Sequence, residues 1–146
     1  MSQGEQDNSK VSSSAILTRE ERRLWVIGSL MVMTAIALGA FGAHAVKSRV
    51  DEQALGWWET AASYHRTHGL SILMIAALWP RVSESCQQRL HRVAQGFCLG
   101  TVLFSGSLYT MTLTSIRTLG MITPIGGTLW LIAWGLFAWS VAKERD

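Results

Sequence analysis

Polar and titratable side chains gather in a few segments of an otherwise apolar chain. One stretch, residues 57–70, reads WWETAASYHRTHGL. Its candidate site residues are Glu59, Tyr64, His65, Arg66 and His68. Three more candidates come from other apolar segments: His44, Ser105 and Tyr109. Histidine and carboxylate groups can move protons, bind metal ions or hold a polar ligand.

The two histidines of this stretch raise the question of a metal or haem site. His65 and His68 are three residues apart on a predicted helix, and His44 or Glu59 would be a third donor. Their spacing is not that of the HExxH motif, which supplies two zinc ligands and a base. We therefore expect no metal and no cofactor, and we expect the histidines to bond to Tyr109 or Ser105. A redox role stays open as an alternative.

No motif in the chain points to an enzyme. The sequence lacks a nucleophile elbow, a Walker loop and a dinucleotide fingerprint. Of the 146 residues, 49% are hydrophobic and 16% are charged, and the net charge is +3. This composition excludes a disordered chain, and we expect neither catalysis nor a nucleic-acid partner.

Four apolar runs predict an all-α fold, an integral membrane bundle of four helices. A spanning helix needs about 20 apolar residues to cross about 30 Å of hydrocarbon. The runs cover residues 24–46, 57–79, 93–116 and 122–142. The second run is the weakest, because only residues 70–79 are fully apolar. We predict that it spans with its polar groups turned inward; a three-span protein with a surface helix is the alternative.

The distribution of Lys and Arg predicts that both termini face the cytoplasm. That orientation places nine basic residues inside: Lys10, Arg19, Arg22, Arg23, Arg81, Arg89, Arg92, Lys143 and Arg145. It places three in the outer loops: Lys47, Arg49 and Arg117. The chain then divides into a flexible polar cytoplasmic leader (1–23), a membrane domain (24–142) and a short cytoplasmic tail (143–146). We expect the cytoplasmic (inner) membrane of a bacterium.

Small residues predict where the helices approach one another, because helices in lipid associate through close backbone contact. The expected packing glycines are Gly39, Gly42, Gly96, Gly100, Gly126 and Gly127. In this topology the polar candidates lie at similar depth in the outer half of the membrane. On the second helix, Glu59, Ser63 and Arg66 share one face, and Tyr64 and His68 lie roughly opposite.

Four blocks of the sequence resemble the YgdD-like or YwdK-like family. They are GAFGAHAV (39–46), WWETAASYHRTHGL (57–70), LFSGSLYTMTLT (103–114) and LGMITPIGG (119–127). The family pattern maps onto Gly39, Gly42, His44, Tyr64, His68, Ser105, Gly106, Ser107, Tyr109, Thr123, Pro124, Gly126 and Gly127. The resemblance implies a small four-span membrane protein, classed as a domain of unknown function, with relatives in eukaryotes. The long leader and the polar His65-Arg66 pair depart from the pattern.

The sequence leaves two kinds of function open. The preferred hypothesis is an accessory or assembly component that acts by helix association, with a membrane protein partner or in a homo-oligomer. The alternative is a small-ligand binding or transport module whose polar pocket lies in the outer half. Either role requires contact with the lipid bilayer.

Overall fold

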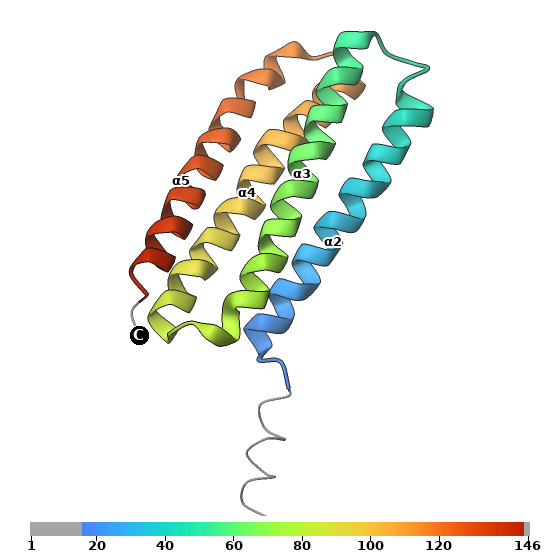
Figure 1. Cartoon of the computed structure of the whole chain (residues 1–146). Helices are drawn as coiled ribbons and strands as arrows, with labels where there is room; N and C mark the ends of the chain where they lie inside the picture. Colours follow the sequence, from blue (N-terminus) through green and yellow to red (C-terminus); the bar gives the residue numbers. More distant parts are fainter. Residues whose placement is uncertain (1–15, 145–146) are drawn as a thin grey trace, which may run out of the picture.

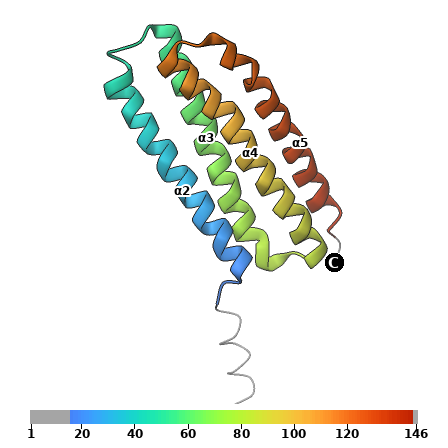
Figure 2. The same ribbon diagram turned by 180° about the vertical axis from the view of Figure 1, so that it is seen from behind.

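Four long helices lie side by side in the computed structural model, which describes residues 16–144 (Figure 1). In chain order they are α2 (Arg19–Phe41), α3 (Glu52–Leu78), α4 (Glu84–Thr114) and α5 (Thr123–Ala142). Three short helices join them: a π-helix (Gly42–Val46) and two 3-10 helices (Trp79–Arg81 and Arg117–Met121). The fold is all-α, as predicted. Both ends of the described chain lie at one end of the bundle (Figures 1 and 2).

Each helix packs on its neighbours in the sequence, and the bundle is open. The extensive contacts join α2 to α3, α3 to α4 and α4 to α5. Figures 1 and 2 show the helices in this order from both sides. Because α2 rests mainly on α3, a groove remains between α2 and α4. This groove is described below.

Within the described part of the chain, three helices are long and apolar enough to cross a membrane: α2 with the π-helix that follows it, α4, and α5 with the 3-10 helix that precedes it. The exception by composition is α3, which carries Glu59 and Arg66. It nevertheless lies between α2 and α4 and runs the length of the bundle (Figure 1). The surface-helix alternative is therefore wrong, because α3 is an integral part of the bundle.

Helix caps extend the helices beyond the predicted spans. The Thr18 hydroxyl accepts a hydrogen bond from Glu21 N at 3.2 Å, so α2 begins at Arg19. Asp51 caps α3 and Ser83 caps α4 in the same way. The leader was predicted to be flexible up to residue 23, but residues 19–23 are helical. The reason is the capping pattern, because a threonine followed three residues later by a glutamate favours the start of a helix. Residues 1–15 and 145–146 of the predicted leader and tail lie outside the described chain.

Close packing occurs at four of the six expected glycines. An added Cβ would lie 2.4 Å from Trp58 Cδ1 at Gly42 and 2.5 Å from Trp130 Cδ1 at Gly100. At Gly96 it would lie 3.0 Å from Ala133 Cβ, and at Gly126 2.5 Å from the backbone nitrogen of Phe104.

The other two glycines do not act this way. At Gly39 nothing lies within 4 Å of the added Cβ, and at Gly127 the contact with Phe104 is an ordinary 3.7 Å. The close approach of α2 to α3 uses Gly69 instead, where the added Cβ would lie 3.1 Å from the Val32 nitrogen. Since spacing alone gives the face of a glycine and not its neighbour, Gly39 was assigned wrongly.

Candidate functional site

His68 is held in an aromatic stack between α3, α4 and α5. Its ring is 3% exposed and lies parallel to the Trp130 indole, with ring centroids 3.8 Å apart. Nδ1 lies 2.9 Å from the Tyr64 carbonyl oxygen, which can only accept, so Nδ1 carries the hydrogen. Nε2 is buried and has no hydrogen-bond partner within the described residues. The histidine acts here as a packed ring.

Tyr64 belongs to the same stack. Its ring lies 5.4 Å from Trp130 and 5.1 Å from Phe104. The Trp130 indole N–H donates to the Phe97 carbonyl at 3.3 Å, and Gly100 leaves room for the indole. These contacts join three helices through aromatic rings rather than through a polar pocket.

His65 lies on another side of α3, facing α2 and α4. Its Nε2 lies 3.4 Å from the Thr34 hydroxyl oxygen, and that hydroxyl donates to the Leu30 carbonyl. The ring Nε2–H is therefore the donor to Thr34. Tyr109 lies nearby, with ring centroids 6.4 Å apart. His65 Nδ1 and the Tyr109 hydroxyl are buried and lack partners within the described residues.

The expected hydrogen bonds from the histidines to Tyr109 or Ser105 are not present among the described residues. The Ser105 hydroxyl donates instead to the Ala61 carbonyl at 2.9 Å and joins α4 to α3. Ser105 is almost fully buried, at 1% exposure. Because the Ser105 hydroxyl already donates to a carbonyl of α3, it does not need a histidine partner.

Glu59 and Arg66 lie on the exposed face of α3. Within the described residues neither takes part in an ion pair. The prediction that the polar groups of this helix turn inward is therefore wrong for these two. Their faces were predicted correctly: Glu59, Ser63 and Arg66 share one side, and His68 lies on another.

His44 lies far along the chain from these groups, in the π-helix that ends the first span, and its side chain is exposed. The eight predicted residues thus do not form one cluster: six of them fall into three pairs on different sides of α3, and His44 and Ser105 are described separately. Tyr64 and His68 face α5, His65 and Tyr109 face the groove, and Glu59 and Arg66 face outward. Ser105 bonds to α3 and also lines the groove section that His65 and Tyr109 face.

This separation also bears on metal binding. Among the described residues no three His, Cys, Asp or Glu side chains are close enough together to hold an ion. His65 and His68 have different neighbours, Thr34 and Trp130. The pairing of these histidines considered in the metal alternative does not occur.

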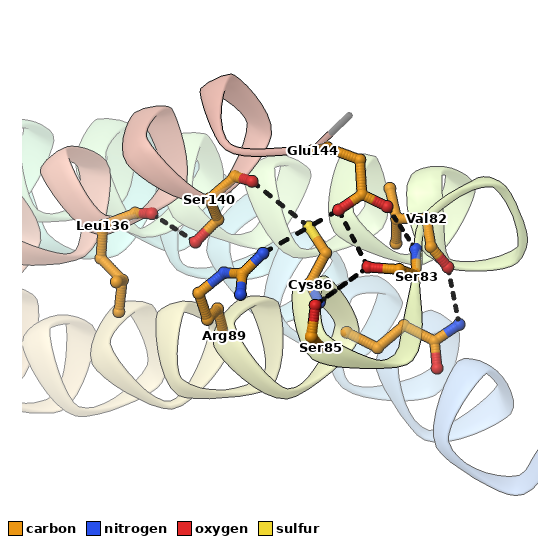
Figure 3. A network of polar contacts seen from close by, with 9 residues as sticks. Val82, Ser83, Ser85, Cys86, Arg89, Leu136, Ser140 and Glu144 are labelled. Carbon is orange, nitrogen blue, oxygen red and sulfur yellow. Dashed lines mark hydrogen bonds and ion pairs between the residues drawn. The ribbon is translucent and has the colours of Figure 1, made fainter. Parts of the chain in front are cut away.

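A polar network joins α4 to the end of α5, at the end of the bundle where the described chain begins and ends (Figure 3). The Glu144 carboxylate accepts hydrogen bonds from the Ser83 backbone N–H and, at 3.0 Å, from the Ser83 hydroxyl. Arg89 Nη2 lies 3.9 Å from the same carboxylate. The Cys86 thiol donates to the Ser140 carbonyl at 3.6 Å. Glu144 therefore holds the first turn of α4 against α5.

Two pKa values reflect this network. The hydrogen bond from the Ser83 backbone N–H lowers the pKa of Glu144, and the Arg89 charge adds to the effect. Burial raises the pKa of the Cys86 thiol, and the nearby Glu144 charge raises it further. The thiolate form of Cys86 is therefore disfavoured at neutral pH.

Acid should weaken the Glu144 contact. Because its folded pKa is lowered, the carboxylate stabilises the fold above its unfolded pKa, and this contribution is lost as the pH falls through the folded pKa. We expect Glu144→Gln to lower the melting temperature in mild detergent at neutral pH and to reduce the loss on acidification. Glu52→Gln, at the first turn of α3, is the matched control. An unchanged pH profile in Glu144→Gln would contradict this role.

Sequence reasoning did not include Trp130 or Glu144 among the site residues. Trp130 forms the closest stack with His68. The sequence feature that could have indicated the position of Trp130 is Gly100 on the neighbouring helix, because a glycine in a tightly packed span leaves room for a large ring. Nothing in the sequence pattern marks Glu144 as the acceptor for Ser83, 61 residues earlier, which precedes the first turn of α4.

The family model and the similar proteins agree on one family of membrane proteins. Residues 38–127 match a family described as "Protein of unknown function (DUF423)". The chain is 38% identical over 109 residues to the UPF0382 membrane protein SAB0533 of Staphylococcus aureus (strain bovine RF122), covering 75% of this chain and 86% of that one. It is 34% identical over 120 residues to the UPF0382 membrane protein YwdK of Bacillus subtilis (strain 168), covering 81% and 94%. The YwdK-like resemblance is confirmed. No solved structure matches the chain.

Proposed function

Because this chain belongs to the DUF423 family, a family of membrane proteins of unknown function, we propose its role from its own geometry: it is an assembly component that pairs with a second copy through one face of α3. We call this face the α3 seam. It consists of Glu59, Ser63, Arg66, Leu70, Met74 and Ala77, all of which are exposed.

The position of Arg66 carries the proposal. Arg66 lies near the middle of α3, a helix of 27 residues that is roughly 40 Å long, so it is deep in the membrane. A charged side chain at the centre of a spanning helix costs about 2.5–3.5 kcal/mol on insertion scales. Such residues nearly always face protein or water, and in the described chain Arg66 has no carboxylate partner. A second helix on the α3 seam would remove this cost.

The pattern of the seam suits another helix. Its residues are spaced four, three, four, four and three apart, close to the alternation of a left-handed helix pair. Gly56 continues it toward the outer end, and nothing lies within 4 Å of an added Cβ there. An open glycine allows two backbones to approach closely.

A second copy has the charges that the seam requires. The seam of each copy carries one carboxylate and one guanidinium, so in a pair related by a two-fold axis Arg66 of each copy can pair with Glu59 of the other. Helical side chains lean toward the N-terminus, and in α3 this is the outer end. Arg66 of one copy therefore extends toward the level of Ser63 and Glu59 in the other.

This role is non-catalytic. Support comes from the histidines, whose rings lie in packing contacts with Trp130 and next to Tyr109. The alternative of an outward polar pocket has less support, because Tyr64 and His68 face α5 while Tyr109 faces the groove. These side chains do not line a common space.

The oligomeric state tests the proposal. In mild detergent or nanodiscs, native mass spectrometry of the full chain should give a dimer. Arg66→Gln should weaken it by about tenfold, the size expected when interhelical polar contacts worth about 1.4 kcal/mol are lost. Arg49→Gln, which removes the same charge from the outer loop, should leave the dimer unchanged.

Two results would contradict the proposal. One is a wild-type protein that contains a single copy of this chain in both environments, whether it is isolated alone or together with a different membrane protein. The other is an Arg66→Gln dimer as stable as the wild-type dimer.

A further inference from the structure

The groove between α2 and α4 runs along α3 from the cytoplasmic end to Tyr109. It has three sections, of about 710, 380 and 400 Å³. The first and second sections share His91 and Gln95, and the second and third share Ile27, Cys98 and Val102. The three sections therefore adjoin one another in a row between α2 and α4, on another side of α3 from the seam.

The chemistry of the groove changes along its length. At the cytoplasmic mouth the walls carry charged and amide groups, among them Arg23, Glu84 and Arg92. Deeper in, the walls are mainly aliphatic, with Ile27, Val102 and Leu99. A polar mouth at headgroup level that leads into an apolar groove has the polarity of an amphiphile.

The length of the groove suits an acyl chain. From Arg92 to Tyr109 along α4 the rise is roughly 26 Å. The hydrocarbon core of a bilayer is about 30 Å thick, so one leaflet is about half of that. Because the groove is longer than one leaflet is thick, a whole acyl chain that enters at the mouth fits in it, and a fully extended chain reaches the level of Gly106, roughly 21 Å from Arg92 along α4.

The charges at the mouth distinguish between headgroups. Arg23 is paired with Glu20 at 2.7 Å, and His91 Nδ1 lies 3.9 Å from the same glutamate. Arg92 and Glu84 remain without an ion pair among the described residues. Glu84 begins α4 at the cytoplasmic surface, and Arg92 lies two turns deeper.

We propose that the groove binds a phospholipid of the phosphatidylethanolamine type, with its phosphate at Arg92, its ammonium at Glu84 and one acyl chain along the groove toward Tyr109. The order of the charges matches, because the phosphate of such a lipid lies nearer the hydrocarbon than the ammonium. Arginine binds phosphate through charge-assisted hydrogen bonds. A purely anionic headgroup would meet the Glu84 carboxylate without compensation.

Lipid titration of the purified full chain tests the headgroup assignment. Dioleoylphosphatidylethanolamine added to the protein in detergent should raise its melting temperature saturably, and more than the choline or glycerol lipid of the same chains. Arg92→Gln should weaken this response by about tenfold. Glu84→Gln should shift the preference toward the phosphatidylglycerol. Arg81→Gln is the matched control, because Arg81 ends the 3-10 helix that precedes α4 at the same end of the bundle, and its guanidinium donates to the Ala77 carbonyl.

A second pair of variants tests the groove itself. Gly106 lines the groove and Gly135 lies on α5, and an added Cβ meets nothing within 4 Å at either position. Gly106→Leu should place a side chain in the path of the acyl chain and abolish the saturable response. Gly135→Leu should retain it.

The two halves of the proposal fail separately, and both are independent of pairing through the α3 seam. Equal responses to the three lipids, or a preference for phosphatidylglycerol in the wild type, would overturn the headgroup assignment. An unchanged response in Gly106→Leu, or equal competition by glycerophosphoethanolamine, which has no acyl chains, would overturn the chain site.

Discussion

Trp130→Ala should lower the free energy of unfolding by about 3–5 kcal/mol, the range for removing a large buried aromatic side chain. Trp130 is 4% exposed and stacks on His68, with Phe104 4.6 Å away between ring centroids. Its removal would leave a cavity where α3, α4 and α5 meet. It would also remove the donor to the Phe97 carbonyl.

The matched control is Trp139→Ala. Trp139 is 51% exposed, and its ring centroid lies 5.4 Å from Arg89 Cζ and 5.0 Å from Lys143 Nζ. Exposed contacts of this kind contribute about 0.5–1 kcal/mol each. Thermal unfolding in one detergent measures both variants. Similar losses for the two would contradict a central role for the Trp130 stack.

Gly126→Ala should destabilise the packing of α4 on α5 by about 1–3 kcal/mol, the usual cost of overpacking. The added Cβ would lie 2.5 Å from the Phe104 nitrogen and 2.8 Å from the Gly100 carbonyl oxygen. Both are backbone atoms, so no side chain can turn away and the helices must separate.

Gly135→Ala is the control for this change, because it lies on the same helix and an added Cβ meets nothing within 4 Å. Since alanine favours a helix over glycine by about 0.8–1.0 kcal/mol, this variant should be as stable as the wild type or more stable. Equal melting temperatures for the two alanine variants would contradict the close approach at Gly126.

The spans could be predicted from the sequence because lipid imposes a strong requirement on length and polarity. The runs at residues 24–46, 93–116 and 122–142 coincide with helices, and Pro124 lies in the first turn of α5 as its missing N–H allows. The helix boundaries were less accurate. Thr18 and Glu21 form a start signal that the apolar pattern does not contain.

The division of the polar residues could not be predicted in full. Helical periodicity places Arg66 and His68 on different faces of α3, and this is correct. Periodicity does not say which neighbour each face meets. The expectation that all polar groups converge assumed a closed bundle, whereas α2 rests mainly on α3 and leaves the far side of α3 exposed. Glu59 and Arg66 therefore face outward.

Disulfide cross-linking in intact membranes tests the central claim, that the α3 seam is a contact between two copies within the bilayer. The starting protein carries Cys86→Ser and Cys98→Ala, which remove both native thiols. Ser63→Cys then places a thiol in the seam, and Thr128→Cys places one on the exposed side of α5. We expect mild oxidation to convert the Ser63→Cys protein into a covalent dimer and to leave the Thr128→Cys protein monomeric. A Ser63→Cys protein that remains monomeric, or that cross-links no better than Thr128→Cys, would contradict the account.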